Sequence, residues 1–174
     1  MTWGFWRSLP GQLLLLVVLG LVAGAVWAQV ARPAQWLVSD GRLELTINAS
    51  RDTFGVLLVF VAVGAVTALV WAMLATVLLG TSWQQVVTVL IGSLVLAVIC
   101  WRVGLLLGPP DPSSAAAGLS DGDMVDDRLS VQGFAPFLVW PIAGLIGMLL
   151  VTWPAAIRDR KAQQGQRATD ATTA

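Results

Sequence analysis

Arg102 is the residue whose type and position most clearly suggest chemistry, because it is a charged side chain with apolar sequence on both sides, in Cys100–Leu105. A charge inside an apolar run predicts a functional contact, which here could be a lipid phosphate or another anion, Asp111, or the Asp121–Asp127 cluster. A structural explanation competes, since the run soon ends and a long arginine side chain can reach the headgroups beside Trp101. We favour the structural explanation and keep the functional one as the alternative.

Four aspartates gather in the short segment Asp121-Gly122-Asp123-Met124-Val125-Asp126-Asp127. Carboxylates can bind a divalent cation, but the segment lacks the ligand at position five, the glycine at six and the glutamate at twelve that an EF-hand needs. A solvated loop is the simpler prediction. Because the chain has no histidine and one cysteine, Cys100, no other set of residues matches a metal site, and we expect that thiol to be buried and inert.

The usual parts of an active site are missing from the sequence. No histidine can act as a base, and no serine has the flanking glycines of a nucleophile elbow. Neither G-x-x-x-x-G-K-[ST] nor G-x-G-x-x-G occurs, so no loop matches a phosphate-binding motif. We therefore expect no catalytic residues, no cofactor and no enzyme activity. The net charge of zero, without basic clusters among aromatic residues, argues against nucleic acid as a partner.

The composition indicates which elements must position these residues. Of the 174 residues, 57% are hydrophobic and 11% are charged, whereas soluble domains carry about 25% charged residues. Three stretches of 24, 49 and 29 residues contain no charge. A membrane-spanning helix needs roughly 20 apolar residues, so the outer stretches can cross once and the middle one twice. The sequence predicts an all-α membrane protein, a single domain in the lipid bilayer with four transmembrane helices in an antiparallel bundle, at about residues 11–30, 53–79, 83–107 and 136–157.

Short polar segments join the expected helices. Gly80–Gln85 divides the longest apolar run and suits a tight helical hairpin, so the second and third helices should be antiparallel neighbours. Gly108–Pro112 ends the third helix, because proline lacks a backbone donor, and opens a polar loop over 108–135. Trp140 and Trp153 bracket the last helix, Arg158–Lys161 follows it, and we expect the tail of glutamine, threonine and alanine after Lys161 to be disordered.

The first loop, residues 31–52, carries the pattern of a β-hairpin. Trp36–Ser39 precedes Asp40-Gly41, which suits a type I′ turn, and Arg42–Ile47 then alternates charged or polar with apolar residues. An isolated hairpin is marginal in water, so its apolar side must rest on lipid, on the other loop or on a partner. We expect a partner protein to dock on its apolar residues, which are Trp36, Leu43, Leu45 and Ile47.

Small residues recur at four-residue spacing along the expected helices. Such faces let helix backbones approach closely in lipid, where van der Waals packing drives association. We expect them to pack the helices of one chain together, and contact with a partner's helix is the alternative. The candidate packing residues are Gly20, Gly24, Gly64, Ala68, Ala72 and Gly147.

An even number of helices places both chain ends on one side of the membrane. That side holds five cations and the other holds four, and the basic cluster Arg158–Lys161 directly follows a helix. Cations favour the cytoplasmic side, so we expect both termini in the cytoplasm, with the hairpin and the acidic loop outside. A signal peptide cleaved after Ala28 is the competing interpretation, although the apolar stretch is long for one.

Four segments of the chain form a distinctive set, namely Ser39–Leu45, Arg51–Leu57, Cys100–Pro112 and Leu138–Pro141. Together they resemble a family of small tetraspan membrane proteins of actinobacteria that is known as a domain of unknown function. The Trp-Arg-x-Gly sequence at Trp101 is the most specific part. Members of the family often have an arginine-rich turn between the second and third helices. The corresponding turn here, Gly80–Gln85, has no arginine. The resemblance implies a bacterial plasma-membrane location and four helices, with no assigned activity.

These features predict an accessory or scaffold subunit without catalytic machinery, which docks another membrane or envelope protein through its outer loops. The alternative is a lipid- or solute-handling protein, such as a transport component, that uses Arg102. Transport by one chain is the weaker hypothesis, because the helix interiors offer few polar side chains and their hydroxyls can bond to their own backbone. These side chains are Thr67, Thr76, Thr88 and Ser93.

Overall fold

The computed structural model of the chain describes residues 9–39, 42–45, 49–112 and 120–173. The predicted helices are present, and all four are long and apolar enough to cross a membrane. Three short strands accompany them. In chain order the elements are α2 (Leu9–Val30), β1 (Gln35–Ser39), β2 (Arg42–Leu45), α3 (Ala49–Leu79), α4 (Trp83–Leu107), β3 (Met124–Asp126) and α6 (Ala135–Thr173).

The ends of α4 lie where the sequence places them, and local hydrogen bonds explain why. Gly80 takes a positive φ of 82°, and the side chain of Ser82 then caps the helix by accepting a hydrogen bond of 3.2 Å from the backbone N–H of Gln85. At the other end, the backbone N–H of Gly108 donates to the carbonyl of Gly104 at 2.9 Å. Two prolines follow directly, so the helix cannot continue.

Two helices are longer than predicted. The second predicted span begins at Ala49 instead of Thr53, which places Asp52 in the first turn of α3, where a negative charge is favourable. The last helix continues to Thr173, so the prediction of a disordered tail after Lys161 is wrong for residues 162–173. Alanine, glutamine, arginine and lysine dominate this extension, and such residues readily prolong a helix that has already formed.

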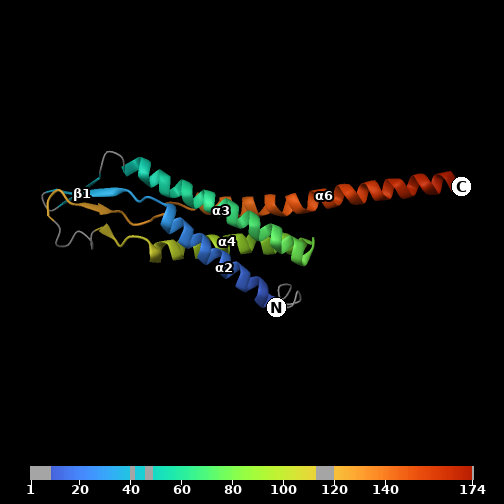
Figure 1. Cartoon of the computed structure of the whole chain (residues 1–174), viewed down its shortest axis with the longest axis horizontal. Helices are drawn as coiled ribbons and strands as arrows, with labels where there is room; N and C mark the ends of the chain where they lie inside the picture. The colour runs from blue at the N-terminus through green and yellow to red at the C-terminus, as the bar shows by residue number, and fades with distance from the viewer. Residues whose placement is uncertain (1–8, 40–41, 46–48, 113–119, 174) are drawn as a thin grey trace.

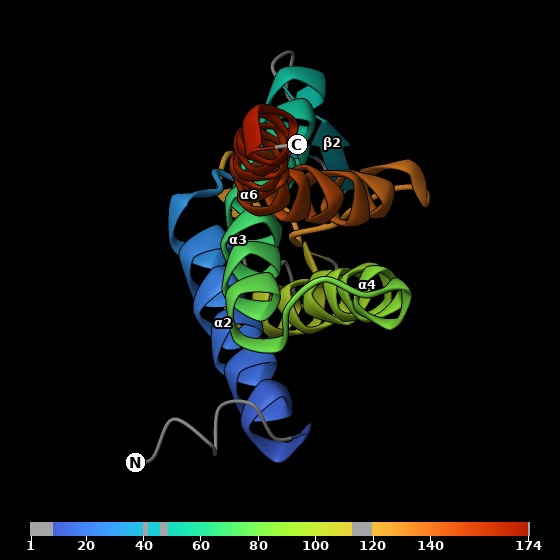
Figure 2. The same cartoon turned by 90° about the vertical axis from the view of Figure 1, so that its right-hand side faces the viewer.

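The sheet lies at one end of the helices, and the start of α2 and the end of α6 lie at the other (Figure 1). Consecutive helices alternate in direction, and α6 extends beyond the rest (Figures 1 and 2). The most extensive interfaces join helices that run the same way, α3 with α6 and α2 with α4. The interface between α3 and α4, the predicted hairpin neighbours, is smaller.

Buried tryptophans fill notches that glycines leave on neighbouring helices. Trp27, Trp71 and Trp140 are each at most 1% exposed. At the facing glycine there is no side chain, and a Cβ built there would overlap the indole ring. These three pairs join all four helices, since they are Trp27 of α2 with Gly104 of α4, Trp71 of α3 with Gly92 of α4, and Trp140 of α6 with Gly64 of α3.

The six candidate packing residues also lie between helices. Ala68 and Ala72 are fully buried, and a Cβ added to Gly147 of α6 would lie 2.6 Å from the carbonyl oxygen of Leu69 in α3. On α2, a Cβ at Gly20 would lie 2.7 Å from Ile99 of α4. The remaining two, Gly24 and Gly64, face Val103 and Trp140. The structure therefore places these small faces within the chain.

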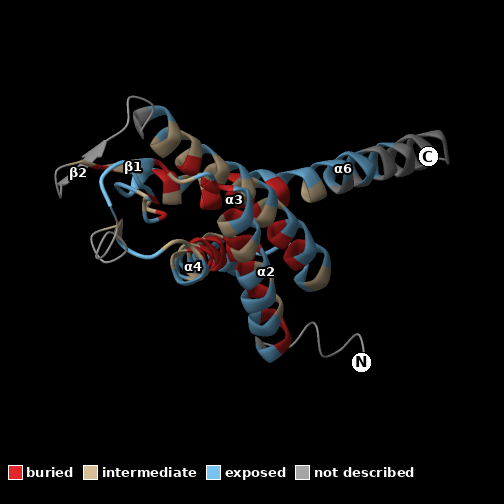
Figure 3. Ribbon diagram, turned by 60° about the vertical axis from the view of Figure 1, so that its left-hand side comes forward, coloured by how far each residue is buried: buried red, intermediate tan, exposed pale blue. Residues whose placement is uncertain are grey.

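Burial follows the same division around the helices. Buried residues gather on the sides that face other helices, and exposed residues cover the outer sides (Figure 3). The exposed sides carry large apolar residues such as Leu13, Val66 and Ile91, which is the surface expected to face hydrocarbon. Trp140, near the start of α6, is completely buried, because the notch at Gly64 of α3 accommodates its ring.

Replacing a notch glycine should destabilise the protein. We expect Gly64→Ala and Gly104→Ala each to lower the free energy of unfolding by about 1–3 kcal/mol, because the new methyl group overlaps a buried indole. Thermal unfolding in mild detergent measures this effect. Gly55→Ala is the matched control, since nothing lies within 4 Å of its Cβ position. Equal stability of Gly55→Ala and Gly64→Ala would contradict the packing described above.

Candidate functional site

The two loops at one end of the helices assemble into a three-stranded sheet. The predicted pairing within the first loop is present, because β1 and β2 are antiparallel with Trp36 opposite Leu45 and Val38 opposite Leu43. The turn Asp40-Gly41 and the candidate residue Ile47 lie outside the described residues. The third strand, β3, was not predicted, and the strand order is β2-β1-β3.

β3 comes from the acidic segment and is held by backbone hydrogen bonds to the first loop. Trp36 pairs with Val125 in the register, the backbone N–H of Val38 donates to the carbonyl of Asp123 at 3.0 Å, and that of Asp127 donates to the carbonyl of Ala34 at 2.6 Å. Three strand residues are too few to show a periodic pattern. The sequence signal that could have found β3 is the apolar pair Met124-Val125 between aspartates.

The two faces of this sheet differ in burial. On one face, Val38 and Val125 are buried, and the buried indole Nε1 of Trp36 has no hydrogen-bond partner among the described residues. On the other face, Gln35 and Met124 are exposed. Trp36, a predicted docking residue, therefore belongs to the covered face, and Leu43 and Leu45 stand opposite covered-face residues of β1 in the register.

Two of the acidic side chains accept hydrogen bonds within the sheet and its loops. A carboxylate oxygen of Asp126 accepts a hydrogen bond of 3.2 Å from the side-chain amide of Gln35, which joins β3 to β1. A carboxylate oxygen of Asp123 accepts one of 3.0 Å from the backbone N–H of Ser120. Among the described residues, no group of three or more His, Cys, Asp or Glu side chains converges on a point where a metal ion could bind.

An aromatic cluster lies between the helices and links three of them, α2, α3 and α6. Phe60 of α3 is completely buried, and its ring centroid lies 5.1 Å from that of Trp27, 5.3 Å from that of Phe137 and 5.5 Å from that of Trp140. The indole N–H of Trp27 donates to the carbonyl of Val56 at 3.1 Å. This buried hydrogen bond holds the C-terminal end of α2 against the N-terminal part of α3.

Arg102 lies at the border of this cluster. Its side chain is exposed, and its guanidinium carbon lies 5.0 Å from the centre of the Trp101 ring. Trp101 in turn meets Phe137 edge-on, with ring centroids 6.0 Å apart. Within the described part of the chain, Arg102 has this cation–π contact and no ion pair with Asp111 or the acidic segment. Its charge is therefore not neutralised by a described carboxylate.

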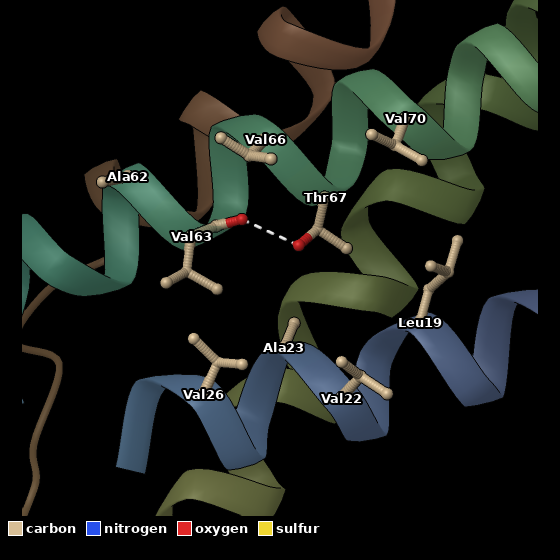
Figure 4. Close-up of a pocket in the computed structure, with 9 residues that line it drawn as sticks. All are labelled: Leu19, Val22, Ala23, Val26, Ala62, Val63, Val66, Thr67 and Val70. Atoms are coloured by element: carbon tan, nitrogen blue, oxygen red, sulfur yellow. Dashed lines mark hydrogen bonds between the residues drawn. The ribbon is translucent and has the colours of Figure 1, made fainter. Parts of the chain in front are cut away.

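Two grooves lie between the helices and are lined mainly by apolar side chains. The larger, about 490 Å³, separates α2 from α3 (Figure 4), and its one polar lining residue, Thr67, donates its hydroxyl to the carbonyl of Val63 at 2.8 Å. The smaller, about 270 Å³, lies among α2, α3 and α4 and includes Gln12 and Thr88. Neither groove offers a set of polar groups for a hydrophilic solute.

Most hydroxyls inside the helices behave as predicted. Those of Thr67, Thr76 and Thr88 donate to a carbonyl one turn earlier in the same helix. The hydroxyl of Ser93 differs, because it is buried and has no partner within the described residues. Cys100 is buried as a free thiol, in agreement with the sequence analysis.

Comparison with known proteins adds no relative. No protein-family model, no curated protein and no solved structure matches the chain. The resemblance to the actinobacterial family therefore stays a prediction.

The pairing of β1 with β3 predicts a specific cross-link. Ala34 and Val38 form backbone hydrogen bonds with Asp127 and Asp123, which flank β3. Gln35 and Asp126 alternate with these pairs along the ladder and therefore form a non-hydrogen-bonded pair, in which the side chains lie closest. We expect Gln35→Cys with Asp126→Cys to form a disulfide readily when Cys100 is replaced by Ala. Mass spectrometry under non-reducing conditions detects it. Gln35→Cys with Asp121→Cys is the control, and equal cross-linking of both pairs would contradict the register.

Proposed function

We propose that the protein is an accessory or scaffold subunit without catalytic machinery, anchored in a bacterial plasma membrane by its four helices. Both termini would lie in the cytoplasm and the sheet outside. The chain would belong to the actinobacterial family that its motifs resemble. The observation that carries the proposal is the sheet, because two loops far apart in the sequence form one surface that has an exposed face and, among the described strands, β3 at its edge.

The exposed edge of the sheet suits the addition of a further strand. In an antiparallel ladder, alternate residues direct their backbone groups to opposite sides. Since Asp123 and Asp127 bond to the β1 side, Met124 and Asp126 direct their N–H and C=O groups away from β1. An extended segment of a partner could pair there, with the exposed side chains of Met124 and Asp126 beside it.

The charge of this edge favours a basic partner segment. Asp121, Asp123 and Asp126 are exposed around β3, and one arginine, Arg128, follows them among the described residues. Complementary charge speeds encounter and selects the partner. We therefore propose that the docked occupant is an extended segment rich in lysine or arginine, which belongs to another membrane or envelope protein. This proposal replaces the apolar docking residues expected from the sequence by the β3 edge.

The alternative function, handling of a solute by one chain, has less support. The two grooves are lined mainly by apolar residues and the threonine hydroxyls bond to their own helices. A hydrophilic substrate would lose its hydration without gaining hydrogen bonds.

A photo-cross-linking experiment tests docking. A photoreactive amino acid at Met124, which is 61% exposed, should give a specific adduct with a basic protein in membranes. We expect Asp126→Lys to reduce the adduct about tenfold, because it places like charges together. Higher ionic strength should also weaken it. The yield on denaturing gels is the measurement.

Two controls make the outcome decisive. The same photoreactive amino acid at Trp83, which is 78% exposed at the opposite end of the helices, should not give that adduct. Gln163→Lys, on an exposed position of α6, should leave the adduct at Met124 unchanged. A chain without an adduct at Met124, or with one that is insensitive to Asp126→Lys, is not a scaffold of the kind proposed.

A further inference from the structure

A line of exposed side chains runs along α4 from its sheet end toward its start. Because an α-helix turns about 100° per residue, Ile91, Val95 and Arg102 lie within about 40° of one another around the helix axis. Arg102 is the charged member of this line. The apolar members are Val87, Ile91, Val95, Val98 and Leu106, and all of them are exposed.

The part of this line farthest from Arg102 is hollowed. Val87, Ile91 and Val95 form one wall of the groove of about 270 Å³, and Leu13 and Leu16 of α2 also line it. The buried residues Trp71 and Gly92 lie at its floor. At 1.5 Å per residue, the groove lies about 10 to 23 Å along the axis from Arg102.

Arg102 lies near the sheet end of this line, away from the groove. Its guanidinium has no anionic partner among the described residues. It is exposed on a side of the helix that otherwise carries apolar residues, and Trp101 contacts it at 5.0 Å. Arg102 lies five residues before the end of α4, about 7 Å, so its side chain can reach the headgroup level. A phosphate is the anion found there, and arginine binds it with two parallel hydrogen bonds.

We propose that this face of α4 binds one glycerophospholipid, with its phosphate on Arg102 and an acyl chain along Val98 and Val95 into the groove. The charge, the apolar line and the groove follow one another in the order of phosphate and chain in such a lipid. The proposal rests on the four apolar helices spanning a membrane. It does not depend on the partner that docks at β3.

Native mass spectrometry of the purified chain tests the phosphate contact. Released from detergent with added phosphatidylglycerol, the chain should retain one lipid, and Arg102→Gln should reduce that occupancy about tenfold. Arg32→Gln is the control, since Arg32 is exposed outside the helices. Arg102→Lys keeps the charge without the planar donor pair and should fall between the two. Occupancy that is unchanged in both Arg102 variants would overturn the proposal.

The groove is tested separately. Ile91→Trp fills the groove and should lower lipid occupancy, whereas Ile146→Trp, at an exposed isoleucine of α6 that does not line it, should not. Equal occupancy in these two variants would overturn the placement of the acyl chain. Excess inorganic phosphate should not displace the lipid, and diacylglycerol should bind poorly. Displacement by inorganic phosphate alone would show that the site binds only an anion. Equal binding of diacylglycerol would show that the phosphate does not contribute to lipid binding.

The variants also separate this proposal from the docking function. Arg102→Gln should leave the adduct at Met124 unchanged, because β3 bonds to the first loop and not to Arg102. Circular dichroism confirms that each variant is folded. Loss of lipid with an intact adduct would support both proposals independently.

Discussion

Close approach of helix backbones is the constraint on which this structure depends. Apolar helices in hydrocarbon gain nothing from leaving lipid, so contact area must hold them together. The chain obtains that area by placing large indoles over glycines, as Trp140 does at Gly64. A glycine notch lets a ring reach the neighbouring backbone, and the ring then fills space that two ordinary side chains would keep open. The most extensive interfaces, α2 with α4 and α3 with α6, join parallel helices, and glycine–indole pairs occur in both of them.

The same packing creates the sheet end of the molecule. Trp27 bonds to the carbonyl of Val56, and Phe60 contacts rings from α2 and α6. The helix ends that carry the two loops are thereby held at a fixed separation. The first loop and the acidic segment can then share backbone hydrogen bonds, which neither could complete alone. A short strand such as β3 is stable because its neighbours are already in place.

The charged side chains of the described residues lie at the surface of the molecule. The interior consists of aromatic rings, small residues and hydroxyls that mostly bond to their own helix. None of the charged side chains whose exposure the structure describes is buried, including Arg102 and the aspartates around β3. This distribution is compatible with the proposed recognition of a partner and of a lipid at the surface.

The sequence by itself determined the four apolar helices, most of their limits and the strand pairing in the first loop, because these depend on local composition, caps and turn residues. It also identified the small faces and the unusual position of Arg102. Tertiary structure alone decided which helices meet, that Trp140 is buried and that three residues of an acidic segment form a strand. Those outcomes depend on contacts between residues far apart in the chain. Local periodicity cannot encode which glycine receives which indole, or which face of a hairpin becomes covered.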